Sequence, residues 1–215
     1  MGNVTEIIKL IANQAKTFNI PYVTALAQDR DPYRVLISCI LSLRTKDKVT
    51  ARVSSNLFRV ADDPYVMHKL KLSVLRKLIY PVGFYRNKAK VIRDITTRLV
   101  NEYDGRVPHA RAELLAFKGV GRKTANLLLG LCFKTPAICV DTHVHRISNR
   151  LGWVRTNYVY DTEHALELVV PKCYWIRLNA LLVSFGQHVC VPISPYCSCC
   201  TVNRFCKKEG IKRCR

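Results

Sequence analysis

Residues 115–125 of the chain read LAFKGVGRKTA, and this stretch decides the fold. It predicts a helix, a tight turn with two glycines and a second helix. Gly119 and Gly121 permit a sharp turn and let backbone N–H groups approach a ligand with no side chain in the way. Arg122 and Lys123 open the second helix, whose N-terminus is a favourable site for an anion. The stretch is typical of a helix-hairpin-helix that grips phosphate, although a purely structural helix–helix turn has the same pattern. The residues expected to meet phosphate are Lys118, Gly119, Val120, Gly121 and Arg122.

The helical pattern extends outward from this hairpin over the whole chain. No segment alternates with period two, so the sequence predicts an all-α fold of two helical domains without a sheet. Pro136 interrupts the pattern and marks a joint between them. Residues 25–135 are expected to form one domain, and residues 1–24 pair with 136–215 as the other. Helices are predicted at 1–18, 32–44, 46–58, 73–80, 86–103, 109–117, 122–133, 142–152, 161–170 and 174–188.

Charge is the main compositional signal. Lys and Arg total 35 against 15 Asp and Glu in 215 residues, a net charge of +20. Such an excess implies a polyanionic partner, most often nucleic acid. Hydrophobic residues make up 49% of the chain, which excludes a disordered protein. No apolar run reaches the roughly 18 residues of a membrane span, and no export signal is evident. The expected location is the nucleus of a eukaryote, or the cytoplasm and nucleoid of a prokaryote.

Four cysteines near the C-terminus have the spacing of a metal centre. Cys190, Cys197, Cys200 and Cys206 form the pattern Cys-x6-Cys-x2-Cys-x5-Cys. So short a loop has little apolar material for a core of its own, and four thiolates without a histidine favour a 4Fe–4S cluster over zinc. A reduced, metal-free set of thiols is the remaining alternative. Cys199 lies between two of these cysteines without altering their spacing, and it is interpreted as a bystander that binds no metal.

These motifs together resemble the endonuclease III family of DNA glycosylases. The resemblance is carried by KGVGRKTAN at 118–126, by VDTHVHR at 140–146 and by the four-cysteine loop, and it runs from about residue 30 to 206. It implies two helical domains flanking a DNA-binding cleft, a 4Fe–4S cluster and excision of oxidised pyrimidines followed by strand cleavage. The implied partner is double-stranded DNA with an oxidised pyrimidine or an abasic site, bound by a monomer.

Within this resemblance, Lys123 and Asp141 are the expected catalytic residues. The helix dipole and the neighbouring cations favour a neutral lysine amine, which a Schiff-base nucleophile requires. Asp141 lies 18 residues further on and has the pattern of a helix N-cap, a role that is compatible with catalysis.

Two loops are expected to enter the duplex. Arg44 stands where the family usually has a glutamine that fills the gap left by the extruded base, and Thr45 and Lys46 follow it. Phe84 occupies the family's wedge position, where leucine is common, and an aromatic ring can stack between bases. The glycine before it, Gly83, is interpreted as freeing the backbone to present that ring.

Two other functions remain open on the sequence alone. A monofunctional mismatch-type glycosylase would lack the lysine nucleophile, so Lys123 argues against it. A non-catalytic helix-hairpin-helix protein with a structural cluster would keep the glycines and the charge, but it would not need both Lys123 and Asp141.

Overall fold

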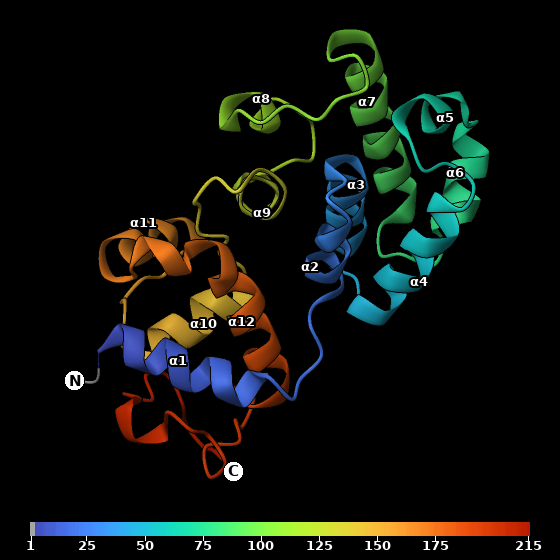
Figure 1. Cartoon of the computed structure of the whole chain (residues 1–215). Helices are drawn as coiled ribbons and strands as arrows, with labels where there is room; N and C mark the ends of the chain where they lie inside the picture. Colours follow the sequence, from blue (N-terminus) through green and yellow to red (C-terminus); the bar gives the residue numbers. More distant parts are fainter. Residues whose placement is uncertain (1–2) are drawn as a thin grey trace. The chain divides into compact units, whose positions relative to one another are not determined.

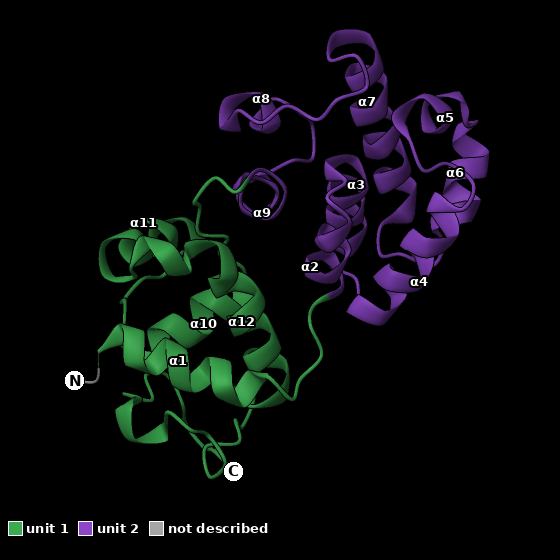
Figure 2. Ribbon diagram, in the orientation of Figure 1, with its two compact units in different colours: residues 1–21, 134–215 green, residues 22–133 purple. Residues whose placement is uncertain are grey.

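The computed structural model describes residues 3–215, and they form an all-α protein. Helices and short 3-10 turns account for its regular structure, and no strand occurs between residues 3 and 215. The chain divides into two compact units, residues 1–21 with 134–215 and residues 22–133 (Figure 2). They are called unit 1 and unit 2 below. No helix within the described part of the chain is both long and apolar enough to cross a membrane.

Unit 2 contains the helices from α2 to α9 (Figure 1). Helix α7 is the longest and packs against α5, α6 and α3, while α9 packs against α3 and α8. The interior is aliphatic, with Leu36, Ile40, Leu99 and Leu128 fully buried. The helices are α2 (Tyr22–Leu26), α3 (Pro32–Ser42), α4 (Asp47–Phe58), α5 (Pro64–Lys69), α6 (Leu72–Ile79), α7 (Tyr85–Glu102), α8 (Arg111–Leu115) and α9 (Arg122–Phe133), with the 3-10 turn η1 (Ala27–Asp29).

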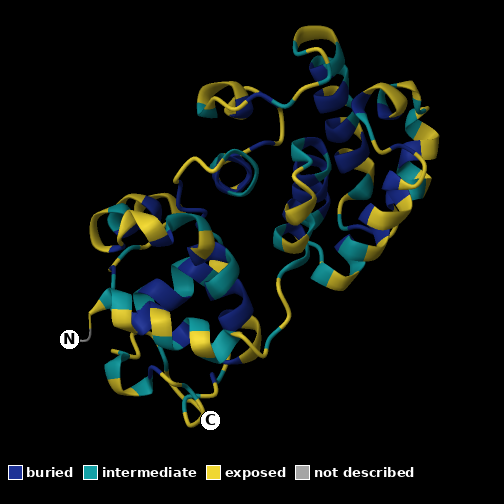
Figure 3. Ribbon diagram, viewed as in Figure 1, coloured by how far each residue is buried: buried dark blue, intermediate teal, exposed yellow. Residues whose placement is uncertain are grey.

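Unit 1 joins the first helix to the C-terminal third of the chain. Its helices are α1 (Val4–Ala15), α10 (Thr142–Leu151), α11 (Val159–Val169) and α12 (Trp175–His188), with the 3-10 turns η2 (Lys172–Tyr174) and η3 (Asn203–Phe205). Helix α12 packs against both α1 and α10. Ile8 of α1, Ile147 of α10 and Leu182 of α12 are buried in one apolar cluster. Figure 3 shows the buried residues along α10 and the exposed ones on the outer side of α11.

The observed helices confirm the predicted all-α fold, with differences in a few elements. Helices α2 and α5 were not predicted, because five or six residues are too few to show a helical period. Helix α5 has a local signal nonetheless: Asp63 caps it by accepting from Val66 N–H at 2.9 Å, and Pro64 takes its first position. Two helices are several residues shorter than predicted: α8 covers only Arg111–Leu115 of 109–117, and α1 covers Val4–Ala15 of 1–18, whose first two residues lie outside the described part of the chain.

Candidate active site and nucleic-acid interface

The glycine-rich hairpin forms where the sequence predicts it, between α8 and α9. Gly119 has φ +86°, and a Cβ there would lie 2.7 Å from Val91 Cγ1 of α7. Gly119 is therefore required by the turn and by its close packing on α7. A Cβ on Gly121 would meet no protein atom within 4 Å. Nothing inside the described protein requires a glycine at position 121, whereas a ligand approaching the backbone would.

The base of the hairpin is fixed by α7. Phe117 is buried beneath the turn, and the Arg98 guanidinium lies 4.7 Å above its ring. Arg98 also donates to the Ala116 carbonyl at 2.8 Å and forms an ion pair with Glu102 at 2.8 Å. Arg98 was not identified from the sequence, because a lone arginine in a basic chain carries no signal of this contact.

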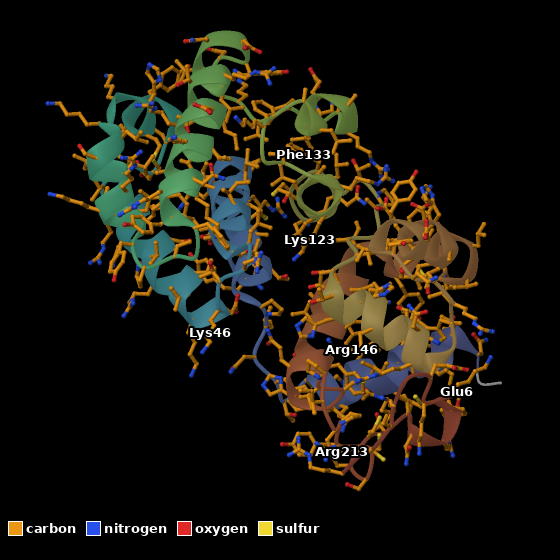
Figure 4. All side chains as sticks on the ribbon, turned by 180° about the vertical axis from the view of Figure 1, so that it is seen from behind. Glu6, Lys46, Lys123, Phe133, Arg146 and Arg213 are labelled. Carbon is orange, nitrogen blue, oxygen red and sulfur yellow. The ribbon has the colours of Figure 1, made fainter. Side chains whose placement is uncertain are left out.

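The two residues predicted to carry the chemistry belong to different units. Lys123 is in unit 2, in the first turn of α9, and its side chain is exposed (Figure 4). Its electrostatic neighbour is Cys39 of α3: burial raises the pKa of the Cys39 thiol to about 12, and the charge of Lys123 opposes that rise. Cys39 therefore remains a neutral thiol within electrostatic reach of Lys123.

Asp141 is in unit 1 and caps α10. Its Oδ1 accepts hydrogen bonds from the backbone N–H groups of His143 and Val144, both at 2.9 Å. The carboxylate is half-buried and lies at the N-terminus of α10, where the helix dipole attracts a negative group. The predicted N-cap role is confirmed, and it holds the carboxylate in a fixed orientation.

The two predicted duplex-entering loops meet in one place within unit 2. The Arg44 guanidinium lies 5.1 Å from the centre of the Phe84 ring. Both side chains are exposed, and both residues have left-handed backbones, with φ +52° and +58°. Left-handed conformations are rare for such residues and concentrate at functional sites. Thr45 follows Arg44 and is half-buried, and Lys46, labelled in Figure 4, is exposed just before α4.

Gly83 has a different role from the expected one. Its φ is not in the left-handed region; Phe84 takes that conformation instead. A Cβ on Gly83 would lie 2.7 Å from the Arg44 carbonyl oxygen. Glycine is therefore required here because the two loops approach each other backbone to backbone, a contact that the sequence alone does not reveal.

The four predicted cluster ligands line one apolar pocket in unit 1. Cys190, Cys197, Cys200 and Cys206 surround it together with Ile147, Leu151 and Phe185 of the helices above. Arg150 donates to Cys190 Sγ at 3.3 Å, and the Lys208 N–H donates to Cys206 Sγ at 3.4 Å. Cys199 is exposed and its thiol turns to the Tyr196 carbonyl, as expected of a bystander.

The four sulfurs are the right kind of donor for a metal centre, although they do not converge on one point. Within residues 3–215 no three His, Cys, Asp or Glu side chains converge closely enough to hold a single ion. Burial is the main cause that raises the pKa of Cys197 and of Cys200 to about 11, and the neighbouring thiols add to it. Such thiols become thiolates when a positive centre binds, and N–H donors to sulfur are typical of iron–sulfur sites. The pocket therefore fits a cluster by its donor set and its apolar lining.

Comparison with known proteins shows the family to which the chain is similar. Residues 37–172 match the family described as HhH-GPD superfamily base excision DNA repair protein. Endonuclease III of Thermotoga maritima is 47% identical over 180 residues, which cover 84% of each chain. Endonuclease III-like protein 1 of Mus musculus is 42% identical over 177 residues, 81% of this chain and 59% of the mouse protein.

The solved structures most relevant here hold the same fold. The trapped endonuclease III–DNA covalent intermediate has a TM-score of 0.86 at 33% identity and covers 95% of this chain and 94% of its own. A thermostable thymine-DNA glycosylase has a TM-score of 0.81 at 26% identity and covers 95% of both chains. With a matching family model and relatives of this identity, the chain belongs to the HhH-GPD superfamily and, within it, to the endonuclease III family of base excision repair DNA glycosylases and abasic-site lyases.

Proposed function

We propose that this enzyme removes oxidised pyrimidines from double-stranded DNA through a Schiff base at Lys123 and then cleaves the strand 3′ to the abasic site. The observation that carries the proposal is the position of Lys123. It is an exposed amine in the first turn of α9, two residues after Gly121, whose backbone is open to a ligand. A phosphate held at the helix N-terminus would bring the neighbouring sugar to this amine.

The chemistry is a substitution followed by an elimination. The neutral Lys123 amine attacks the anomeric carbon of the extruded nucleotide, and the glycosidic bond breaks as the base leaves with its electron pair and takes up a proton. Opening of the sugar ring gives the Schiff base. A proton then leaves the adjacent carbon, the bond to the 3′ phosphate oxygen breaks, and the strand is nicked.

Asp141 is assigned the acid–base role. A carboxylate fixed by two backbone N–H groups can hold or deprotonate the Lys123 amine and stabilise the positive charge that builds on the sugar. Its two capping bonds supply the orientation that such a group needs.

The remaining site residues are assigned to DNA binding and to the cofactor. Arg44 and Phe84 would fill the space left by the extruded base, and the hairpin with Thr45 and Lys46 would bind phosphates. Cys190, Cys197, Cys200 and Cys206 would hold a 4Fe–4S cluster. With a protein thiolate on each iron, such a cluster would supply rigidity to a basic loop rather than an open coordination site.

Borohydride trapping tests the proposal. An oligonucleotide duplex with one oxidised pyrimidine should give a covalent adduct with the wild type and none with Lys123→Gln, which should still bind the duplex. Lys172→Gln, at an exposed lysine of η2, is the matched control and should trap normally. A normal adduct with Lys123→Gln would assign the nucleophile to another amine. Base release without any adduct in the wild type would instead favour a monofunctional glycosylase. If the wild type gave neither base release nor an adduct, a non-catalytic DNA-binding protein would be favoured.

Asp141→Asn separates catalysis from helix capping. Asparagine caps a helix about as well as aspartate, so the melting temperature should stay close to that of the wild type. The excision rate should fall at least about 10²-fold, a typical scale for losing a positioned acid–base group. A normal rate measured in single-turnover kinetics would leave Asp141 with the cap alone.

A further inference from the structure

Lys88 is a buried lysine that the proposed chemistry does not use. It lies in the first turn of α7, and only 6% of its surface is exposed. Its ammonium donates to the carbonyls of Leu41 and Leu43, at 2.8 and 2.5 Å, and to the Thr45 hydroxyl at 3.1 Å. A buried charge is costly unless it is fully hydrogen-bonded, and here three donors meet three acceptors. Burial lowers the pKa of Lys88 to about 8, so the ammonium form predominates at neutral pH.

Two of these acceptors are carbonyls at the C-terminal end of α3. The last carbonyls of a helix have no partner within it, and a cation at that end is favoured by the helix dipole. The Lys88 ammonium satisfies them from a different helix. The chain leaves α3 at Leu43, with ψ 118°, and Arg44 then takes its left-handed conformation. Lys88 thus fixes the end of the helix from which Arg44 projects.

The third acceptor connects the second loop. The Thr45 hydroxyl accepts from Lys88 and also from the Gly83 N–H at 3.2 Å, and it donates to the Leu43 carbonyl at 3.3 Å. The hydroxyl hydrogen and two acceptor positions are therefore in use. The Lys88 backbone N–H donates to the Phe84 carbonyl at 3.0 Å. Lys88 contacts one loop by its side chain and the other by its main chain.

We propose that Lys88 is the positioning residue that locks the Arg44 loop and the Phe84 loop into one preassembled wedge, which enters the duplex as a unit. The proposal rests on the duplex-entering roles assigned above to Arg44 and Phe84. The contact between the two side chains, with the Arg44 guanidinium 5.1 Å from the centre of the Phe84 ring, is consistent with such a unit. Preassembly matters because a wedge that must be ordered during base extrusion adds that cost to the barrier.

Two variants break the lock to different extents. Lys88→Met keeps the length and the apolar stem of the side chain but removes all three donors. Thr45→Val is nearly isosteric and removes the bridge between Lys88 and Gly83 together with the Thr45 bond to the Leu43 carbonyl, whereas the Leu41 and Leu43 carbonyls keep the Lys88 ammonium. Lys90→Met, at an exposed lysine two residues further along α7, is the matched control for loss of charge. Melting temperatures of all four proteins show which of them are folded.

The first readout needs no catalysis. In a duplex with a tetrahydrofuran abasic analogue opposite 2-aminopurine, insertion of the wedge unstacks 2-aminopurine and raises its fluorescence. The wild type and Lys90→Met should show this rise at saturating protein, and Lys88→Met and Thr45→Val should lose most of it. A rise of wild-type size in a folded Lys88→Met or in Thr45→Val would overturn the proposal. If Lys88→Met does not fold, Thr45→Val decides.

The second readout separates the wedge from the active site. Single-turnover excision from the duplex should fall about 10- to 100-fold in the two lock variants, the scale expected when a positioning group is displaced. In Lys88→Met, trapping on a single-stranded abasic oligonucleotide should stay within about twofold, because no partner strand has to be opened. Parallel loss on both substrates would identify Lys88 as a general stability residue and overturn the proposal. A wild type that excises no oxidised pyrimidine would refute the proposed function, and the fluorescence test would still decide the role of Lys88.

Discussion

At the scale of single residues, the Arg44–Phe84 stack determines what the wedge can recognise. The guanidinium lies over an aromatic ring, and its N–H groups are on an exposed side chain that an unpaired base could reach. Arginine carries donors only, and guanine presents two acceptors, O6 and N7. In the role proposed for it, Arg44 would therefore favour a guanine opposite the lesion.

The first prediction follows from this donor–acceptor match. Lesions opposite guanine should be excised faster than lesions opposite adenine, and Arg44→Gln should reduce the difference, because glutamine offers both a donor and an acceptor. One bidentate contact corresponds to about 1–3 kcal/mol of discrimination. Single-turnover rates with each of the four opposite bases measure it. Equal rates for all four partners in both proteins would limit Arg44 to a backbone contact.

At the scale of elements, the two glycines of the hairpin have separable roles. Gly119→Ala should destabilise the protein by about 1–2 kcal/mol or more, because φ +86° disfavours any side chain and the new methyl group would clash with Val91. Gly121→Ser should keep stability, because the space around Gly121 is open and serine suits a helix N-terminus.

Duplex binding distinguishes the two positions. Gly121→Ser should weaken binding of an abasic-site duplex, since its side chain occupies the approach of the phosphate, although the melting temperature is unchanged. Thermal unfolding and fluorescence anisotropy on the same preparations measure both effects. Unchanged affinity in Gly121→Ser would identify the hairpin as a purely structural helix–helix turn, the alternative that the sequence leaves open.

The elements also show how far the sequence could be used to predict the structure. Helices such as α3, α7 and α9 were predictable because their apolar residues repeat at helical spacing over a long stretch. Their ends are also marked, by Asp31 before α3, by Gly105 after α7 and by the glycine turn before α9. The hydrogen bonds of Lys88 could not be predicted, because its partners lie over forty residues away in the sequence and become neighbours only when α3 and α7 pack together. The same holds for Gly83, whose constraint is a carbonyl from another loop.

At the scale of the whole molecule, hydrogen bonds and part of the apolar core hold the cysteine loop to the rest of unit 1. Gln14 of α1 donates to the Cys199 carbonyl at 2.7 Å and accepts from the Thr201 N–H at 3.1 Å. Cys190, Cys200 and Cys206 pack against the edge of the unit 1 core. A cluster at this place would add a covalent link between parts of the loop to these contacts.

Iron content and colour test for this cluster. Purified protein should be yellow-brown with about four iron atoms per chain, as a 4Fe–4S centre requires. Cys200→Ser should lose the colour and much of the soluble yield, whereas Cys199→Ser, one position away and exposed, should keep both. Stoichiometric zinc without visible absorbance would replace the iron–sulfur assignment by a zinc site.

The net charge of +20 belongs to the molecule as a whole and predicts how binding responds to salt. Each phosphate that the protein neutralises releases condensed counterions, so the logarithm of the affinity falls by about 0.9 per phosphate for each unit rise in the logarithm of the salt concentration. Titrations of an abasic-site duplex between about 50 and about 200 mM salt should therefore show a steep, linear loss of affinity. Lys118→Gln should make the slope shallower by about 0.9, because Lys118 is an exposed cation of the hairpin that is expected to meet one phosphate. An affinity that does not change with salt would mean that the charge serves solubility rather than the binding of DNA.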